Sequence, residues 1–204
     1  ELSSRLTIVG SHGWEWSEPT GPRPIPAPPA STRKRLKMAY EAALAAGREV
    51  LPDQDDLRMR IEEKIASIAV HVRGINEGEA DRWLERIRST WEEMANSTLE
   101  ISEFNGGIEL RAVGRDKGQV VRELRARYPG ANLLVYIGDD RTDEDAFRSL
   151  ASTGIGIRVG PINVPTAAQF RIEDVPGVRD FLYNWQRMVC QATRGRGQWE
   201  RADW

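Results

Sequence analysis

A short apolar run that ends in a cluster of acids constrains this chain more than any other feature of its sequence. Residues 133–137 are continuously apolar, which is typical of a parallel strand buried on both faces, and Gly138 then frees the backbone. Asp139, Asp140 and Asp143 follow, at the edge where open α/β sheets bind ligands. Neighbouring carboxylates repel one another unless a hard cation or a proton intervenes, and oxygen ligands suit Mg²⁺. The run therefore predicts a magnesium site with these three aspartates as ligands.

The same acids have a second interpretation as the start of a helix. Thr142 is followed three residues later by Asp145, which resembles a helix N-cap, and the helix dipole favours acids in the first turn. This interpretation accounts for Asp143 to Asp145 but gives no reason for two adjacent acids at a strand end. An EF-hand loop is disfavoured, since no Gly stands at its sixth position and no Glu at its twelfth.

Four stretches, spread over almost the whole chain, carry a resemblance to one known family. They read G-S-H-G-W-E at 10–15, E-E-K and H-V-R at 62–64 and 71–73, I-E-L and G-R-D-K-G at 108–110 and 114–118, and G-D-D-R-T-D-E-D-A-F at 138–147. In this order they resemble the motifs of trehalose-6-phosphate phosphatases, which belong to the haloacid dehalogenase (HAD) superfamily. The resemblance implies an α/β fold: a HAD-like, doubly wound (Rossmann-like) parallel sheet core, here incomplete, with an inserted α/β cap domain.

The resemblance also implies roles for individual residues. Lys117, at the start of a helix expected from 117 to about 127, would contact the nucleophile and the phosphate, helped by the helix amino terminus. Glu15 and Glu109 suit sugar hydroxyls, because a carboxylate can accept two hydrogen bonds. Without the resemblance, Lys117 would be interpreted as a solvated surface lysine, and His71 as a strand histidine whose hydrogen bonds are made within the protein. The full substrate-binding set is His12, Glu15, Lys64, His71, Arg73 and Glu109.

The implied activity is the Mg²⁺-dependent hydrolysis of trehalose 6-phosphate to trehalose and phosphate, through an aspartyl-phosphate. The phosphorylated disaccharide is the expected substrate, and a trehalose-phosphate synthase is the expected partner or fused domain. Two alternatives stay open. One is a non-catalytic sugar-phosphate-binding or regulatory HAD-like module, and the other is a related HAD sugar phosphatase that acts on a different glycoside.

One motif that the superfamily requires has no counterpart in the sequence. This motif, D-x-D-G-T, supplies the aspartate that accepts the phosphoryl group and a second that acts as general acid and base, and a later Ser or Thr holds the phosphate. The D-x-D at 53–55 lies in a polar stretch without a preceding apolar strand and is interpreted as a solvated loop. The chain also begins at Glu1 rather than Met, so we expect at least two β/α units upstream, about 60 residues. We expect no turnover from this chain alone.

The remaining sequence predicts how the chain is organised into domains. Residues 19–29 hold six prolines in eleven positions, which forbids a helix and disfavours a central strand. This stretch is predicted to be a linker, with a Pro-rich binding peptide as the alternative. The predicted domains are a core segment 1–16, a cap domain 17–112 that includes the linker, a core segment 113–192 and a flexible tail 193–204.

Apolar spacing predicts the elements of the cap. Helices are expected from a cap at Ser31 to about residue 47 and over 79–94, with Trp83 and Trp91 in the core. A strand over 64–73 is expected to place its apolar and polar side chains on opposite faces, and a second strand around 108–112 repeats the pattern. His71, Arg73 and Glu109 fall on the polar faces. Lys64 falls on the apolar face by the same alternation. Its side chain can therefore reach a site on the polar face only from a bulge or from the end of the strand.

After residue 117 the pattern alternates helix and strand, as in a doubly wound sheet. A strand near 133–137, a helix over 143–150 and a strand over 156–159 are expected. The last helix is expected over 178–191. Its predicted buried side consists of Val178, Phe181, Leu182, Trp185, Met188 and Val189.

Composition excludes several functional classes. A net charge of −2 and a pI near 5.9, without a broad basic stripe, argue against nucleic acid as a partner. No apolar run approaches the about 20 residues needed to cross a bilayer, and no signal peptide is visible, so no membrane is expected. The single cysteine, Cys190, is predicted to be a buried thiol in a reducing cytoplasm.

Overall fold

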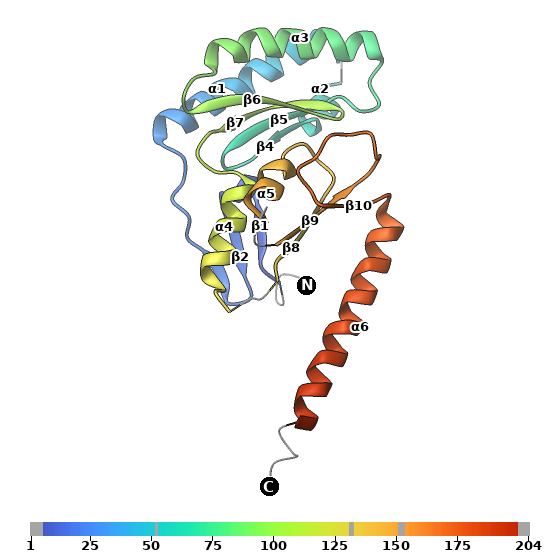
Figure 1. The fold of residues 1–204 in the computed structure, drawn as a ribbon. Coiled ribbons are helices and arrows are strands. Elements are labelled where there is room, and N and C mark those ends of the chain that lie inside the picture. Colours follow the sequence, from blue (N-terminus) through green and yellow to red (C-terminus); the bar gives the residue numbers. More distant parts are fainter. Residues whose placement is uncertain (1–5, 52, 131–132, 151–153, 200–204) are drawn as a thin grey trace. The chain divides into compact units, whose positions relative to one another are not determined.

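The computed structural model describes residues 6–51, 53–130, 133–150 and 154–199, with side chains described up to residue 191. The chain forms two compact units, Glu1–Glu123 and Leu124–Trp204, and helix α4 crosses the boundary. The elements of the first unit are β1 (Ile8–Gly10), a 3₁₀ turn (Ser11–Gly13), β2 (Glu15–Glu18), β3 (Gly21–Arg23), α1 (Ala30–Gly47), α2 (Gln54–Met59), β4 (Ile61–Glu63), β5 (Ser67–His71), α3 (Glu77–Met94), β6 (Leu99–Phe104), β7 (Gly107–Ala112) and α4 (Lys117–Arg127) (Figure 1). Those of the second are β8 (Val135–Gly138), α5 (Asp143–Leu150), β9 (Ile155–Val159), β10 (Phe170–Ile172) and α6 (Val175–Trp199).

An antiparallel sheet of four strands, in the order β4-β5-β7-β6, forms the centre of the first unit. Its register sets Ile68 opposite Leu110 and Ala69 opposite Glu109. Ile68 and Leu110 are fully buried on one face of the sheet. Helices α1 and α3 lie side by side and cover this face (Figure 1). The predicted alternation along both strands is therefore confirmed. The opposite, polar face carries Glu62, Ser67, His71, Glu100, Glu109 and Arg111.

Two tryptophans hold the helical layer together. Trp83 and Trp91 lie on α3, fully buried, and each indole Nε1 donates to a backbone carbonyl of α1, at 3.1 Å to Ala43 and 3.1 Å to Ala39. These bonds satisfy the one polar atom of each ring while the rest of the ring fills the core. The prediction that both tryptophans are core residues is confirmed.

The polar stretch at 53–55 is not the loop that the sequence predicted. Asp53 is the N-cap of α2, and its carboxylate accepts hydrogen bonds from the backbone N–H groups of Asp55 and Asp56. A capping aspartate satisfies donors that would otherwise lack partners, so a polar run can start a helix as well as form a loop. The N-cap of α1 is also different from the prediction, because Pro29 rather than Ser31 occupies it.

The predicted strand 64–73 begins three residues late. The backbone N–H of Lys64 donates to the carbonyl of Ser67 at 2.9 Å, which closes a tight turn between β4 and β5. Lys64 therefore lies at the end of a hairpin, which is one of the two positions that the alternation required.

A small antiparallel sheet, β1-β2-β3, precedes the Pro-rich stretch and includes part of it. The predicted linker 19–29 therefore contains β3, an edge strand in which Pro22 is tolerated because an edge has no second neighbour to bond. Trp16 of β2 is buried, with the guanidinium of Arg23 4.7 Å from its ring centre. The domain boundaries at 16 and 112 remain a prediction.

The second unit is built on a parallel sheet in the order β10-β9-β8, with α5 joining β8 to β9. The parallel strands and the connecting helix confirm the predicted α/β pattern. Phe147 and Leu150 of α5 are fully buried. In the described part of the chain β8 is an edge strand, and its residues are half-buried, so the prediction of a strand covered on both faces is wrong. A strand at an edge has a single neighbour, which leaves its side chains partly open to solvent. Leu133, just before the strand, is 46% exposed.

The last helix differs most from its prediction. Helix α6 begins three residues earlier than predicted and continues to Trp199, because glycines weaken a helix by only about 1 kcal/mol each. It extends away from the end of β10 (Figure 1), and the side predicted to be buried is only partly so: Leu182 is 53% and Met188 57% exposed, whereas Val178, Phe181 and Trp185 are half-buried. Cys190 is also exposed, not buried. The backbone of 193–199, predicted as a tail, is helical, and 200–204 lies outside the described residues.

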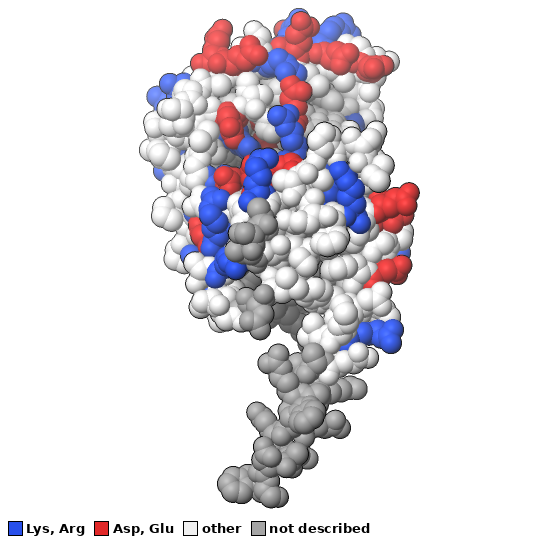
Figure 2. Space-filling model, viewed as in Figure 1, with Lys and Arg blue, Asp and Glu red and all other residues white. Residues whose placement is uncertain are grey.

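The charged surface agrees with the small net charge. Figure 2 shows acidic and basic side chains interspersed over the layer formed by α1 and α3, at the top of the view. Among the described helices, none combines the length and the apolar character needed to cross a bilayer.

Candidate functional site

A strained turn presents the first group of predicted site residues. Ser11, His12 and Gly13 all have positive φ, at 48°, 55° and 101°, which is unusual for the two residues that carry side chains. The backbone N–H of Trp14 donates to the Ser11 carbonyl at 3.1 Å, and the Ser11 hydroxyl donates to the carboxylate of Glu15. A side chain at Gly13 would meet Val120 at 2.8 Å, so this position requires glycine for space as well as for φ. The turn thus fixes His12 and Glu15 in place.

Glu109 is the centre of the polar face of the four-stranded sheet. It is 6% exposed, and its Oε2 accepts a hydrogen bond from His12 Nε2 at 3.0 Å. Its Oε1 accepts from the Ser67 hydroxyl at 2.7 Å and lies 3.5 Å from Lys64 Nζ. Burial by itself raises the pKa of Glu109, but the hydrogen bonds from His12 and Ser67 and the charges of His12 and Lys64 outweigh it and lower the pKa to about 2. Glu109 is therefore ionised at neutral pH although it is buried.

A second carboxylate extends this group toward the rim of the sheet. Glu62 Oε2 lies 3.4 Å from Lys64 Nζ and 3.3 Å from His71 Nε2. The structure thus joins four of the six predicted sugar-binding residues, His12, Lys64, His71 and Glu109, in one continuous polar network. Ser67 and Glu62 belong to it but were missing from the predicted set. The alternating pattern had placed Ser67 on the polar face, and nothing else in the sequence set this hydroxyl apart.

The other two predicted sugar-binding residues lie beside the network. Arg73 follows β5, and its Nη2 donates to the carbonyl of Asn105 at 2.8 Å. Glu15 is exposed and is held by Ser11. Neither of them bonds to Glu109 within the described part of the chain.

Replacing Glu109 by Gln is expected to change the pH dependence of folding. Because folding lowers the pKa of Glu109 from 4.5 to about 2, the carboxylate contributes stability above pH 4.5, and this contribution is lost as the pH falls toward 2. This lowering of the pKa corresponds to a contribution of about 3 kcal/mol to the free energy of unfolding. Urea unfolding between pH 7 and pH 2 should show Glu109→Gln less stable than the wild type at neutral pH, with the difference shrinking below pH 4.5.

The matched control for this experiment is Glu63→Gln, because Glu63 is an exposed carboxylate on β4 of the same sheet, separated from the strand of Glu109 by β5. It should follow the wild-type curve throughout. Parallel curves for Glu109→Gln and the wild type would contradict the role assigned to the ionised Glu109.

The start of α4 is bonded to the Ser11–Gly13 turn. Lys117 is the first residue of the helix, and the carboxylate of Asp116 caps it by accepting from the N–H of Gln119 at 2.6 Å. Arg115 Nε donates to the Gly13 carbonyl at 2.6 Å, and its Nη2 donates to Glu123 at 2.8 Å. Arg115 therefore fixes the beginning of α4 relative to the turn. The motif match had not singled it out, because this position of the family pattern admits any residue.

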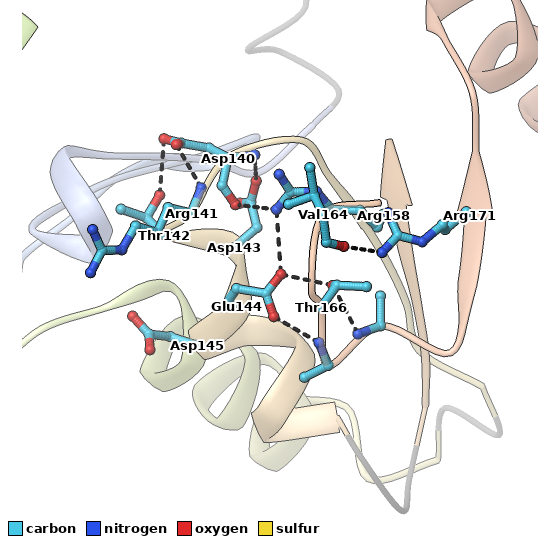
Figure 3. Close-up of polar contacts among 12 residues, drawn as sticks. Asp140, Arg141, Thr142, Asp143, Glu144, Asp145, Arg158, Val164, Thr166 and Arg171 are labelled. Carbon is cyan, nitrogen blue, oxygen red and sulfur yellow. Dashed lines mark hydrogen bonds and ion pairs between the residues drawn. The ribbon is translucent and has the colours of Figure 1, made fainter. Parts of the chain in front are cut away.

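The acidic loop, residues 138–143, runs from the end of β8 to the start of α5 (Figure 3). Asp143 is 3% exposed, and its carboxylate accepts from the Tyr136 hydroxyl and from the Asp140 N–H, each at 2.7 Å. A Cβ at Gly138 would lie 2.4 Å from Asp143 Cγ, so only glycine leaves room for this arrangement. Burial raises the pKa of Tyr136, and the hydrogen bond to Asp143 and the charges of the loop raise it further. The carboxylate of Asp143 is thus buried and bonded to β8 and to the backbone of its own loop.

The three predicted metal ligands have different surroundings. The Asp140 carboxylate accepts from the N–H of Arg141 at 2.6 Å and from the Thr142 hydroxyl at 3.3 Å. Asp139 is exposed, and its carboxylate makes no hydrogen bond or ion pair with the described residues. No three His, Cys, Asp or Glu side chains converge on a metal-sized site in the described ranges. Mg²⁺ often binds proteins through one or two carboxylates together with water and phosphate oxygens, and Asp139 fits such a ligand.

The fold of this chain, over 90% or more of its length, resembles solved phosphatase structures. A phosphatase of the haloalkanoate (HAD) enzyme superfamily from Bacteroides thetaiotaomicron superposes with a TM-score of 0.55 at 15% identity, covering 90% of this chain and 78% of that one. A trehalose-6-phosphate phosphatase related protein gives a TM-score of 0.65 at 22% identity, covering 92% and 75%. At these identities the similarity concerns the fold alone. Together with the parallel sheet and its helices, it defines a HAD-like α/β protein.

Sequence comparison identifies the family. The model of the trehalose-phosphatase family matches residues 3–176. Trehalose 6-phosphate phosphatase RA3 of Zea mays is 32% identical over 201 residues, which cover 88% of this chain and 53% of the maize protein. This chain therefore belongs to the trehalose-phosphatase family. It spans about half the length of the plant relatives that it matches.

Proposed function

We propose that this chain is part of a Mg²⁺-dependent phosphatase that hydrolyses trehalose 6-phosphate to trehalose and phosphate. One observation carries the proposal: His12, Lys64 and Ser67 converge on the ionised Glu109 at the polar face of a sheet, in a member of the trehalose-phosphatase family. The name of the maize relative, a trehalose 6-phosphate phosphatase, supports the same substrate.

In the proposed function the polar face of the sheet binds the sugar. Glu109 accepts from three protein donors and so keeps His12 and Lys64 in position, which leaves about one of its four acceptor sites for a hydroxyl. Lys64, His71 and Arg73 retain exposed donors, and the exposed carboxylate of Glu15 can accept from sugar hydroxyls. A disaccharide with many hydroxyls and one phosphate matches this mixture of donors and acceptors.

The phosphate chemistry is proposed to use Asp139 and Lys117. Asp139 would hold Mg²⁺, with Asp140 and Asp143 around it, and the bound ion would neutralise charge on the phosphate oxygens. Lys117 stands at the first turn of α4, where its charge and the helix amino terminus both favour an anion. No D-x-D-G-T occurs in the 204 residues, so in this proposal the attacking aspartate comes from outside them.

The expected partners follow from the substrate. A trehalose-phosphate synthase, which makes the phosphorylated disaccharide, is proposed as a partner or as a fused domain. The site of action is proposed to be the cytoplasm, where sugar phosphates are found.

The proposed substrate is tested on the complete protein that contains this chain. Phosphate release with Mg²⁺ is measured for trehalose 6-phosphate, glucose 6-phosphate and sucrose 6-phosphate, and we expect kcat/KM to favour the first by about 100-fold or more, because buried polar groups penalise a poorly matched sugar. A preference for another phosphate would favour a related sugar phosphatase. Binding without turnover would favour a regulatory module.

A further inference from the structure

We propose that Glu144 and Arg158 are positioning residues for the acidic loop, and that they act by fixing the backbone of Asp140 against the loop between β9 and β10. The inference rests on the proposed phosphatase function, because it concerns the geometry of Asp139 in that site. Neither residue belongs to the predicted set of ligands or substrate contacts.

Arg158 reaches the acidic loop from the neighbouring strand. It lies on β9, is 8% exposed, and its Nη1 donates to the backbone carbonyl of Asp140 at 3.0 Å (Figure 3). The β8–β9 register places Gly138 opposite Arg158, so this bond continues the sheet contact into the loop. Asp139 lies between Gly138 and Asp140. Holding the backbone on both sides of Asp139 limits the directions that its carboxylate can take.

Glu144 connects Arg158 to a second loop. It lies in the first turn of α5, and its Oε1 is 3.3 Å from Arg158 Nη1 and accepts from the Thr166 hydroxyl at 2.7 Å. Its Oε2 accepts from the N–H of Ala167 at 2.8 Å. Figure 3 shows both oxygens of Glu144 directed at these partners. One carboxylate thus joins the acidic loop, through Arg158, to the loop at residues 160–169.

The loop at residues 160–169 is held at further points, so it can serve as a fixed support. Arg171 of β10 donates to the carbonyl of Pro161 at 2.7 Å and also to that of Val164. Gln169 Oε1 accepts from the N–H of Gly156 on β9 at 2.6 Å. Side chains from β10 and from the loop itself therefore fix its backbone independently of Glu144.

The charge and burial of the pair favour a positioning role over a purely stabilising one. The side chains of Arg158 and Glu144 are 10% and 15% exposed, and a buried ion pair of this kind gives little net stability because of the desolvation of both charges. Arg158 Nε is buried without an acceptor among the described residues, which is a further cost. Glu144 balances the charge of Arg158, so the arginine can bind the loop backbone without neutralising Asp139. Because the pair adds little stability, its role is assigned to the orientation of the acidic loop.

The next residue of the helix provides a matched control. Asp145 is also an acid in the first turn of α5, but its carboxylate pairs with Arg148 at 2.6 Å on the outside of the helix. Asp145→Asn removes one negative charge close to the acidic loop without touching the bonds of Glu144. It separates an effect of charge from an effect of position.

The experiment compares Glu144→Gln, Arg158→Met, Arg158→Lys and Asp145→Asn in the complete protein. Partners that orient a metal ligand typically contribute 10- to 100-fold, so we expect Glu144→Gln and Arg158→Met to lower kcat and to raise the half-saturating Mg²⁺ concentration by about these factors. KM for trehalose 6-phosphate should stay within about twofold, because the sugar-binding residues are untouched. Arg158→Lys should recover part of the loss, and Asp145→Asn should match the wild type.

Hydrogen exchange of the same proteins gives a readout that does not depend on the reaction. The amides of 139–143 and 166–168 should exchange at least about 10-fold faster in Glu144→Gln than in the wild type, because Ala167 loses its acceptor and Arg158, which holds the acidic loop, loses its charged partner. If the wild type proves inactive on trehalose 6-phosphate, the proposed function fails, and the exchange comparison still decides whether Glu144 positions the loop. Unchanged exchange in both segments would overturn the inference. So would a lower melting temperature with unchanged kcat and Mg²⁺ dependence.

Discussion

Residues 1–204 expressed alone are expected to release no measurable phosphate from trehalose 6-phosphate, even with Mg²⁺ present and the chain folded. In the proposed function the attacking aspartate and its general-acid neighbour belong to a D-x-D-G-T motif, which does not occur in the 204 residues. Removing members of a cooperating catalytic unit costs about 10⁴-fold or more. Phosphate release from the chain alone is compared with release from a version extended upstream to a D-x-D-G-T start, which we expect to be active.

The control for this comparison is the extended version with its first D-x-D aspartate changed to asparagine. It should be as inactive as the chain alone, while circular dichroism shows that all three proteins are folded. Comparable rates from the chain alone and from the extended protein would contradict the assignment. An acceptor would then have to be sought among the acids of residues 138–147.

Asp139→Asn in the complete protein is expected to reduce activation by Mg²⁺ more than any other substitution in the acidic loop. A metal ion contributes several kcal/mol to the stabilisation of transition-state charge, so we expect kcat/KM to fall by about 10³-fold. Asp139 is the loop acid whose carboxylate is exposed and makes no hydrogen bond with the described residues. Asp143→Asn should have the second largest effect and Asp140→Asn the smallest. Magnesium titrations of activity measure the three effects.

Melting temperatures separate ligand loss from structural loss in the same variants. Asp143 accepts from Tyr136 and from the N–H of Asp140, so Asp143→Asn should destabilise the second unit, whereas Asp139→Asn should not. A wild-type dependence on Mg²⁺ in Asp139→Asn would remove Asp139 from the metal site. In that case the buried Asp143 would be the next ligand to test.

Local signals in the sequence predicted several elements at their observed bounds. Helix α4 was expected over 117–127 and α5 over 143–150, and both are found there, because each begins beside acids that satisfy or favour a helix amino terminus. Strand alternation also placed His71 and Glu109 on one face. These properties depend on neighbours in the sequence, which is why a single chain reveals them.

The same local signals did not predict which side chains are buried by contacts between elements. The apolar side of α6 was visible as a spacing, but spacing does not reveal whether another element covers it, and the structure leaves Leu182, Met188 and Val189 exposed. The apolar run before the acidic loop likewise indicated a strand without indicating that it lies at an edge of the described sheet. Burial depends on which elements meet, and this information is spread over the whole chain.

The candidate site was predictable only in part for the same reason. The family resemblance supplied His12, Lys64, His71 and Glu109, and the structure joins them in one network. The resemblance did not supply Ser67, which contributes a single hydroxyl to Glu109 from a strand 42 positions away. Glu144 and Arg158 are 14 positions apart and meet only because α5 returns the chain to the neighbouring strand. Such pairs have no periodicity in the sequence.

The close approach of Gly138 to Asp143 links the evolutionary histories of the two positions. A methyl group at 138 would lie 2.4 Å from the Asp143 side chain, so alanine there becomes acceptable only after position 143 has become smaller. A smaller residue at 143 would in turn leave the hydroxyl of Tyr136 without its acceptor. Each single step is thus harmful while the other residue is unchanged, and the effect of alanine at 138 depends on the residue at 143. Gradual drift at this corner of the sheet would therefore be expected to retain the pair or to replace both residues together.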